Sequence, residues 1–113
     1  MENFIPILSR RKPKNLEEFN LIDCKINSTV SGDLINNFVY NSSGIKKLSL
    51  VNANITANSF IYLCEFIKEC RSLVDLNLSY NGFRPAQMFQ LINILKDDRK
   101  LVNVNLSWNS FLI

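Results

Sequence analysis

Few side chains in this 113-residue sequence have the types and spacing that catalysis needs. Adjacent carboxylates occur at Glu17-Glu18 and at Asp97-Asp98, and paired acids can perform acid–base chemistry. Neighbouring residues on a strand point to opposite faces, however, and the second pair precedes two basic residues where a helix is expected to end. The sequence contains no histidine, so no Ser-His or Cys-His nucleophile system can form. We therefore predict that the protein is not an enzyme.

The cysteines and glycines do not indicate a metal or cofactor site. Cys24, Cys64 and Cys70 are not spaced as metal ligands, and the three glycines are too far apart for a phosphate-binding loop. Cys64 lies on an apolar helical stripe and Cys24 in a repeated position, so we expect both to be buried, unreactive thiols. Cys70, near a helix end, is expected to be partly exposed. We predict no metal and no cofactor.

The net charge of +3 comes mainly from one basic cluster. Arg10, Arg11, Lys12 and Lys14 place four positive charges within five residues. Such a cluster can bind nucleic acid or direct nuclear import, but no basic stripe extends it, so we interpret residues 1–15 as a solvated N-terminal flank or cap. No apolar run reaches the roughly 18 residues of a membrane helix, and no signal peptide is visible. We expect a cytoplasmic protein, with a nuclear location as the alternative.

An internal repeat organises the rest of the chain. Four segments starting at residues 16, 45, 73 and 101 align without gaps, and each has apolar residues at its first, fourth, sixth and eleventh positions. The fourth and sixth positions share one face of an extended strand, so the pattern predicts short strands that are buried on one face only. The sixteen apolar residues are Leu16, Phe19, Leu21, Ile26, Ile45, Leu48, Leu50, Ile55, Leu73, Leu76, Leu78, Phe83, Leu101, Val104, Leu106 and Phe111.

Between the predicted strands the apolar residues follow a helical period. Phe60, Leu63, Cys64 and Ile67 have the spacing i, i+3, i+4, i+7, and the same offsets recur one repeat later. Thr56 precedes this stripe and is a favourable N-cap. The interval between the first two strands carries a weaker version of the pattern, and we expect a shorter helix there.

A strand, a turn and a helix repeated every 28–29 residues resemble the leucine-rich-repeat family, in its ribonuclease-inhibitor-like subclass. The family pattern L-x-x-L-x-L-x-x-N/C-x-L is matched closely by the segments that start at Leu73 and Leu101. The resemblance covers residues 16–113, with the last repeat incomplete. It implies an α/β leucine-rich-repeat solenoid, with a short parallel β-sheet on the concave face and helices on the convex face. Ala53 departs from the pattern at the ninth position, so Asn52 or Asn54 is expected to satisfy that turn.

The open face of the expected sheet carries the candidate binding residues. Tyr80 and Trp108 both occupy the eighth position of their repeats, so they should be neighbours and could form a binding hot spot. The alternative is that they only pack on each other or on a missing repeat. The candidates for partner binding are Tyr80, Trp108, Asp75, Asn77, Asn103, Asn105, Lys47 and Asn52.

These observations predict a non-catalytic protein–protein interaction module. It would bind a partner protein through the concave face or through the exposed end of the solenoid, without nucleic acid or membrane. One alternative is a structural subunit or a fragment of a larger assembly, which would associate through an uncovered C-terminal end. Another is a GTPase-regulating leucine-rich-repeat protein, by family analogy alone.

Overall fold

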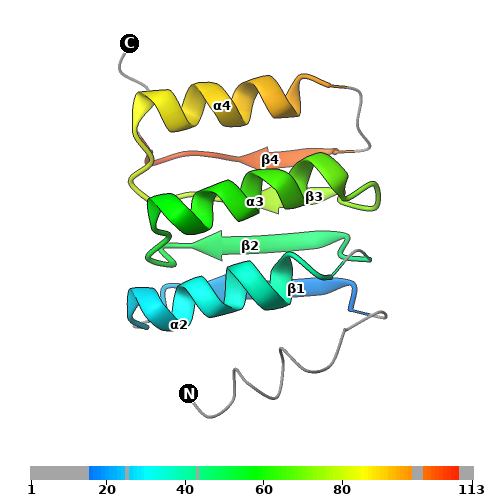
Figure 1. Cartoon of the computed structure of the whole chain (residues 1–113). Helices are drawn as coiled ribbons and strands as arrows, with labels where there is room; N and C mark the ends of the chain where they lie inside the picture. The colour runs from blue at the N-terminus through cyan, green and yellow to red at the C-terminus, as the bar shows by residue number, and fades with distance from the viewer. Residues whose placement is uncertain (1–15, 25, 43, 98–100, 110–113) are drawn as a thin grey trace.

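The computed structural model describes residues 16–24, 26–42, 44–97 and 101–109. The predicted N-terminal flank, with its basic cluster, and Phe111 lie outside these residues. Strands and helices alternate along the chain (Figure 1). In order they are β1 (Glu18–Ile22), α2 (Ser28–Asp33), the π-helix η1 (Leu34–Val39), β2 (Lys47–Val51), α3 (Ala57–Glu69), β3 (Asp75–Asn77), α4 (Pro85–Leu95) and β4 (Asn103–Asn105).

The four strands form one parallel sheet in the order β1-β2-β3-β4. The pairing advances by one repeat at each step, so that Phe19 lies opposite Leu48, Leu48 opposite Leu76, and Leu76 opposite Val104. This register confirms the alignment of the four sequence segments. Within the described residues, the helices all lie on one face of the sheet and leave the other face open (Figure 1). The molecule is therefore a small α/β domain with a four-stranded parallel sheet.

The core lies between the sheet and the helices. Leu48, Leu50, Leu76 and Leu78 are fully or almost fully buried there, as the fourth and sixth positions predict. Burying a side chain of this size contributes about 1.5–3 kcal/mol. Val104 was expected in the core, but this expectation was wrong. Val104 is 43% exposed, whereas Leu76, its partner in the strand register, is 2% exposed. Among the described residues, no further strand lies beyond β4 to cover it.

Side chains at the starts of α3 and α4 satisfy backbone groups there. Thr56 is the N-cap of α3, and its hydroxyl oxygen accepts a 3.2 Å hydrogen bond from the Ser59 backbone N–H. α4 begins at Pro85, whose missing N–H removes no helical hydrogen bond at this position. The Gln87 side chain accepts a 2.8 Å bond from the Arg84 backbone N–H. These contacts confirm the predicted cap at Thr56.

The first helical segment differs from the expected shorter helix. α2 and η1 together run continuously over residues 28–39, and the backbone N–H of Tyr40 bonds to the carbonyl of Ile35 at 3.1 Å, an i→i+5 contact. The first repeat spans 29 residues (16 to 45) and the second 28 (45 to 73). A π-helical turn holds more residues than an α-helical turn, so it absorbs the additional residue. Phe38 and Val39 consequently remain buried against the sheet.

An asparagine ladder connects successive repeats at the carboxyl ends of the strands. The Asn81 side-chain oxygen accepts a 3.0 Å bond from the Ala53 backbone N–H, and its Nδ2 donates to the Leu50 carbonyl at 2.6 Å. Asn109 contacts the third repeat in the same way. Its side-chain oxygen accepts a 3.1 Å hydrogen bond from the Asn81 backbone N–H. The expectation that Asn52 or Asn54 satisfies the second turn is therefore wrong. Asn81, from the following repeat, satisfies the backbone groups of this turn instead.

Candidate protein-binding surface

The open face of the sheet begins with a row of charged and amide side chains. The register places Glu18 beside Lys47, Lys47 beside Asp75, and Asp75 beside Asn103. The Asn103 Nδ2 donates a 2.5 Å hydrogen bond to the Asp75 carboxylate. Three of the predicted binding residues, Lys47, Asp75 and Asn103, thus lie together on this face.

A second row contains Asn77 and Asn105, which are partners in the register. The side-chain oxygen of Asn77 accepts bonds from the backbone N–H and the hydroxyl of Ser79, at 3.1 and 2.7 Å. Asn105 makes the same pair of contacts with Ser107, at 3.0 and 2.6 Å. These bonds fix the orientation of both amide groups. Among the described residues, no acceptor binds their side-chain nitrogens, which leaves two donors for a ligand.

A third row follows the strands at their carboxyl ends and consists of Asp23, Asn52, Tyr80 and Trp108; we call it the carboxyl-edge row. All four residues have left-handed backbone conformations, with φ of 53°, 50°, 60° and 59°. The same hydrogen bond recurs along the row: each of the first three backbone N–H groups donates to a carbonyl of the next repeat, at 2.8–3.2 Å. Asn52, Tyr80 and Trp108 were predicted binding residues, whereas Asp23 was missed. Its only signal in the sequence is the shared eighth position.

Tyr80 and Trp108 form an aromatic stack at one end of this row. Their ring centroids lie 5.4 Å apart and the ring planes are inclined by 16°. The predicted neighbourhood of the two side chains is confirmed. Tyr80 nevertheless remains 52% exposed and Trp108 69% exposed. The two rings therefore pack on each other and still present a large amphipathic surface to solvent.

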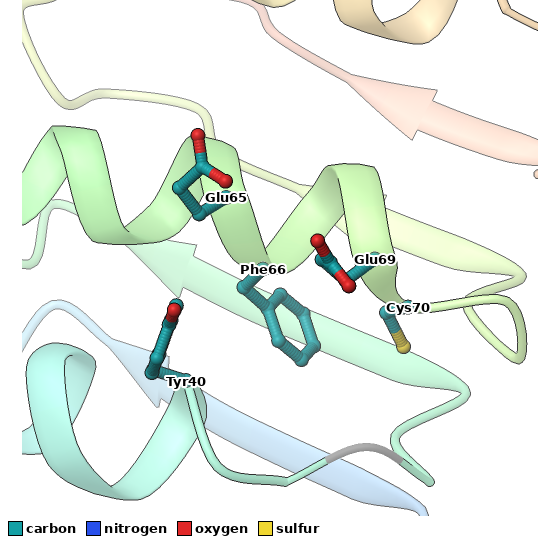
Figure 2. A pocket seen from close by; sticks show the side chains of 5 residues that line it. All are labelled: Tyr40, Glu65, Phe66, Glu69 and Cys70. Atoms are coloured by element: carbon teal, nitrogen blue, oxygen red, sulfur yellow. The ribbon is translucent and has the colours of Figure 1, made fainter.

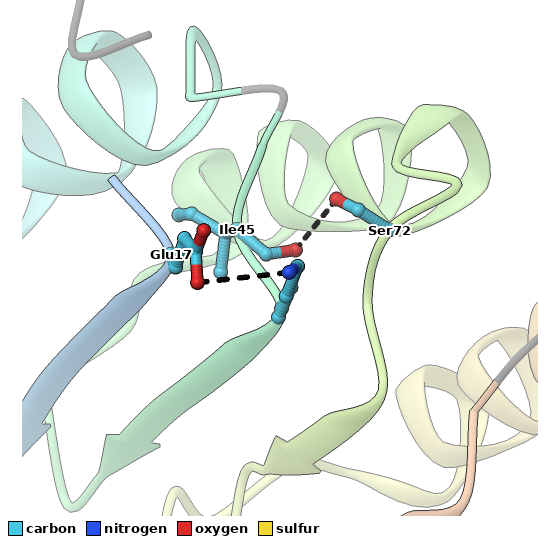
Figure 3. Close-up of polar contacts among 4 residues, drawn as sticks. Glu17, Ile45 and Ser72 are labelled. Carbon is cyan, nitrogen blue, oxygen red and sulfur yellow. Dashed lines mark hydrogen bonds and ion pairs between the residues drawn. The ribbon is translucent and has the colours of Figure 1, made fainter. Parts of the chain in front are cut away.

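The amino ends of the strands are connected by polar contacts instead. The Ser72 hydroxyl donates a 2.9 Å bond to the Ile45 carbonyl, and the Lys46 ammonium lies 3.6 Å from the Glu17 carboxylate (Figure 3). The ion pair is solvent-exposed, and such pairs contribute at most about 1 kcal/mol. The first contact joins the two ends of the second repeat and the second contact joins this repeat to the first, so we assign both a structural role.

A pocket lies on the helical side of the molecule, away from the open face. Its volume is about 360 Å³. Figure 2 shows that the lining side chains come from the second half of α3 and from the C-terminal ends of α3 and η1. Glu65 forms an ion pair with Lys68 at 3.5 Å. Phe66 and Cys70 belong to the buried core beneath the pocket. The lining residues are Tyr40, Glu65, Phe66, Glu69 and Cys70.

The three thiols differ in their environments. Cys64 is buried, and desolvation raises its pKa to about 11, so it remains protonated and a poor nucleophile at neutral pH. Cys24 was expected to be buried but is exposed, because among the described residues no helix or strand covers the turn after β1 on that side. Cys70 was expected to be partly exposed but is buried, with its sulfur 3.4 Å from the Ile45 carbonyl. Within the described ranges, no group of three His, Cys, Asp or Glu residues is arranged to hold a metal ion.

The edge beyond β4 exposes apolar side chains. Val102 and Val104 are exposed at the strand, and Ile92 is exposed on α4. The residue equivalent to Ile92 in the preceding repeat is Cys64 on α3, which is buried. We call the surface formed by Val102, Val104 and Ile92 the β4 edge.

In the described part of the chain, no helix is long and apolar enough to cross a membrane.

The arrangement of these elements is similar to that of a solved structure. The chain resembles a tropomodulin C-terminal domain. The solved structure of that domain, from Caenorhabditis elegans, superposes with a TM-score of 0.71 at 26% sequence identity. The match covers 99% of this chain but 66% of the other, so this chain spans just under two thirds of its neighbour. No protein-family model and no curated protein sequence matches the chain.

This likeness corrects the expected subclass. The ribonuclease-inhibitor-like assignment was wrong, because the similar solved structure is a tropomodulin domain. The repeat period and the apolar positions specify a strand, a turn and a helix in each unit. They constrain local geometry, which different subclasses can share, and so they do not identify the subclass.

Proposed function

We propose that this protein is a non-catalytic, leucine-rich-repeat-like interaction module. Its sheet and helices form a short solenoid, and a partner protein binds the concave open face and the carboxyl-edge row. The observation that carries the proposal is the exposed stack of Tyr80 and Trp108 on left-handed backbone. Aromatic side chains of this kind often provide most of the binding energy of an interface, at about 2 kcal/mol or more each.

The surroundings of the stack support this role. Asn77 and Asn105 supply fixed amide donors next to the aromatic residues, and Asp75 and Lys47 add charges on the same face. A large apolar group beside oriented polar groups is the usual composition of a protein interface. The backbone hydrogen bonds of the sheet and the asparagine ladder hold these residues on a rigid frame, which lowers the entropy cost of binding.

Affinity purification with the whole chain as bait tests the proposal. The double variant Tyr80→Asn/Trp108→Asn should lose the proteins that the unmodified chain captures, because both anchors are removed. Phe89→Ala is the matched control, since Phe89 is 59% exposed on α4. It should retain capture. Capture that survives in the double variant and is lost in the Phe89 variant would place binding on the helical side and contradict the proposal.

A second candidate function is a subunit contact through the β4 edge. The exposed Val104 and Ile92 favour it, because their equivalents in the preceding repeat are buried. Sedimentation of the chain at increasing concentration should then show association, and Val104→Lys should abolish it. A chain that stays monomeric at high concentration would reject this candidate without affecting the first.

A further inference from the structure

The carboxyl-edge row has an unexpected choice of residues. At φ near +60°, aspartate and asparagine are enriched, whereas large side chains are uncommon and strained. Asp23 and Asn52 follow this preference, but Tyr80 and Trp108 do not. Bulky residues held in a strained backbone conformation often serve a function rather than the fold. Since both rings are exposed, their contribution to the core is small.

The stack leaves one kind of surface available. Tyr80 covers one face of the Trp108 indole, and the 69% exposure of Trp108 leaves its other face open to solvent. The face of an aromatic ring carries negative charge density and attracts cations, and tryptophan binds them best. A guanidinium group also stacks flat on such a face. The open side of Trp108 is therefore suited to an arginine side chain.

The charges around the row favour the same ligand. The described charged side chains on the open face and in the row are three carboxylates, from Glu18, Asp23 and Asp75, and one ammonium group, from Lys47. Asp23 stands at the opposite end of the row from Trp108, and its carboxylate is oriented by a 2.6 Å bond from the Asn52 Nδ2. The row thus has an exposed aromatic ring at one end and a carboxylate at the other.

We propose that the carboxyl-edge row binds an extended basic segment of a partner protein, with one arginine on the open face of Trp108 and a second at Asp23. This assignment rests on the proposed function and names its partner chemistry. Four neighbouring strands place the ends of the row about 14 Å apart, at about 4.8 Å per strand. An extended chain advances about 3.3 Å per residue, so the two arginines should be about four residues apart. Tyr80 and Asn52 would contact the residues of the partner segment that lie between the two arginines.

Titration of the full chain with synthetic peptides tests the proposal, with Trp108 fluorescence as the readout. Trp108 is the only tryptophan in the sequence, so a change reports on the row itself. The probe is a Gly/Ser peptide with two arginines four residues apart. It should give a saturable change that weakens as salt is added. A peptide with glutamine in place of both arginines, and one with adjacent arginines, should bind more weakly, by about fivefold or more.

Variants locate the two contacts, with affinity measured by calorimetry. Asp23→Asn should weaken the arginine peptide several-fold, and Trp108→Leu should weaken it about fivefold. Phe89→Leu, an exposed aromatic on the other side of the molecule, should change nothing. No saturable binding, equal binding of the glutamine peptide, or full affinity in the Asp23 and Trp108 variants would overturn the proposal.

Two further outcomes separate this inference from the proposed function. If the arginine peptide fails while partner capture still needs Tyr80 and Trp108, the partner is not basic and the proposed function stands. If capture itself survives the double variant, the proposed function fails. A concentration-dependent change without peptide, abolished by Arg10→Gln/Arg11→Gln, would assign the row to the basic cluster of the chain itself and overturn the partner assignment.

Discussion

The residues of the carboxyl-edge row carry opposing contributions to stability. A left-handed conformation costs a non-glycine residue about 1–2 kcal/mol, and asparagine accepts it more readily. The stacking contact between Tyr80 and Trp108 stabilises the folded state by about 0.5–1.5 kcal/mol. Tyr80→Asn/Trp108→Asn should therefore leave the free energy of unfolding unchanged or raise it by up to about 2 kcal/mol, as measured by urea denaturation. A loss of stability greater than about 1 kcal/mol would show that the pair serves the fold.

The thiols give a second prediction at this scale. Cys24 should react with iodoacetamide at pH 8 in the folded protein, whereas Cys64 and Cys70 should react only after unfolding. Mass spectrometry of the modified peptides distinguishes them.

Because the pKa of Cys64 is about 11 in the folded protein and about 9 in the unfolded chain, the folded state retains a proton that the unfolded state releases between these pH values. The free energy of unfolding should fall as pH rises from 9 to 11, and Cys64→Ala should reduce that fall.

At the residue scale, the sequence pattern predicted the periodic features correctly but not the turns. The spacing correctly placed Tyr80 beside Trp108 and Thr56 at a helix start. It placed Cys24 in the core because it aligns with Asn81, although the turn after β1 is exposed. The left-handed conformations of Tyr80 and Trp108 were not predicted either, since neither residue type favours them.

Each strand contributes to the core according to whether its neighbours cover it. Leu76→Ala should lower the free energy of unfolding by about 2–5 kcal/mol, because the side chain is buried and leaves a cavity. Val104→Ala is the control in the same register row, and being exposed it should cost less than about 1 kcal/mol. Thermal or urea unfolding measures both. Equal losses for the two variants would contradict the described burial.

The π-helix provides a test of how the repeat length is accommodated. Deletion of Asn36 shortens the first repeat to 28 residues and brings Phe38 and Val39 to the offsets of Phe66 and Ile67 in the next repeat. It also removes a buried side-chain oxygen that has no hydrogen-bond partner among the described residues. The variant should fold with an uninterrupted α-helix and equal or higher stability, measured by urea unfolding. NMR would show an i→i+4 bond at Tyr40. Failure to fold would mean that the π-turn is required.

At the scale of elements, the sequence predicted nearly all of the strands and helices. Sixteen matched apolar positions determined the strand faces and the register. The π-helix was missed because helical periodicity alone does not show where one extra residue is absorbed. The ladder contact from Asn81 to Ala53 was missed because it joins residues 28 positions apart, and local patterns carry no record of such pairs.

At the scale of the whole molecule, the described residues form similar units, each of which packs beside the one before it. This arrangement explains why burial falls from Leu76 to Val104 and why the β4 edge is apolar. It also explains why the sequence identified the repeat but not the correct subclass, since each unit satisfies the same local rules. The likeness to the tropomodulin C-terminal domain came from the arrangement of the units in space.

The central claim about this protein is that a partner binds the open side of the sheet. NMR chemical-shift mapping of the full chain, titrated with the two-arginine peptide, tests this directly. We predict shifts concentrated at Asp23, Asn52, Tyr80 and Trp108, with little change on α3. Shifts concentrated around Tyr40 and Glu65 on the helical side, with the carboxyl-edge row unchanged, would contradict the account.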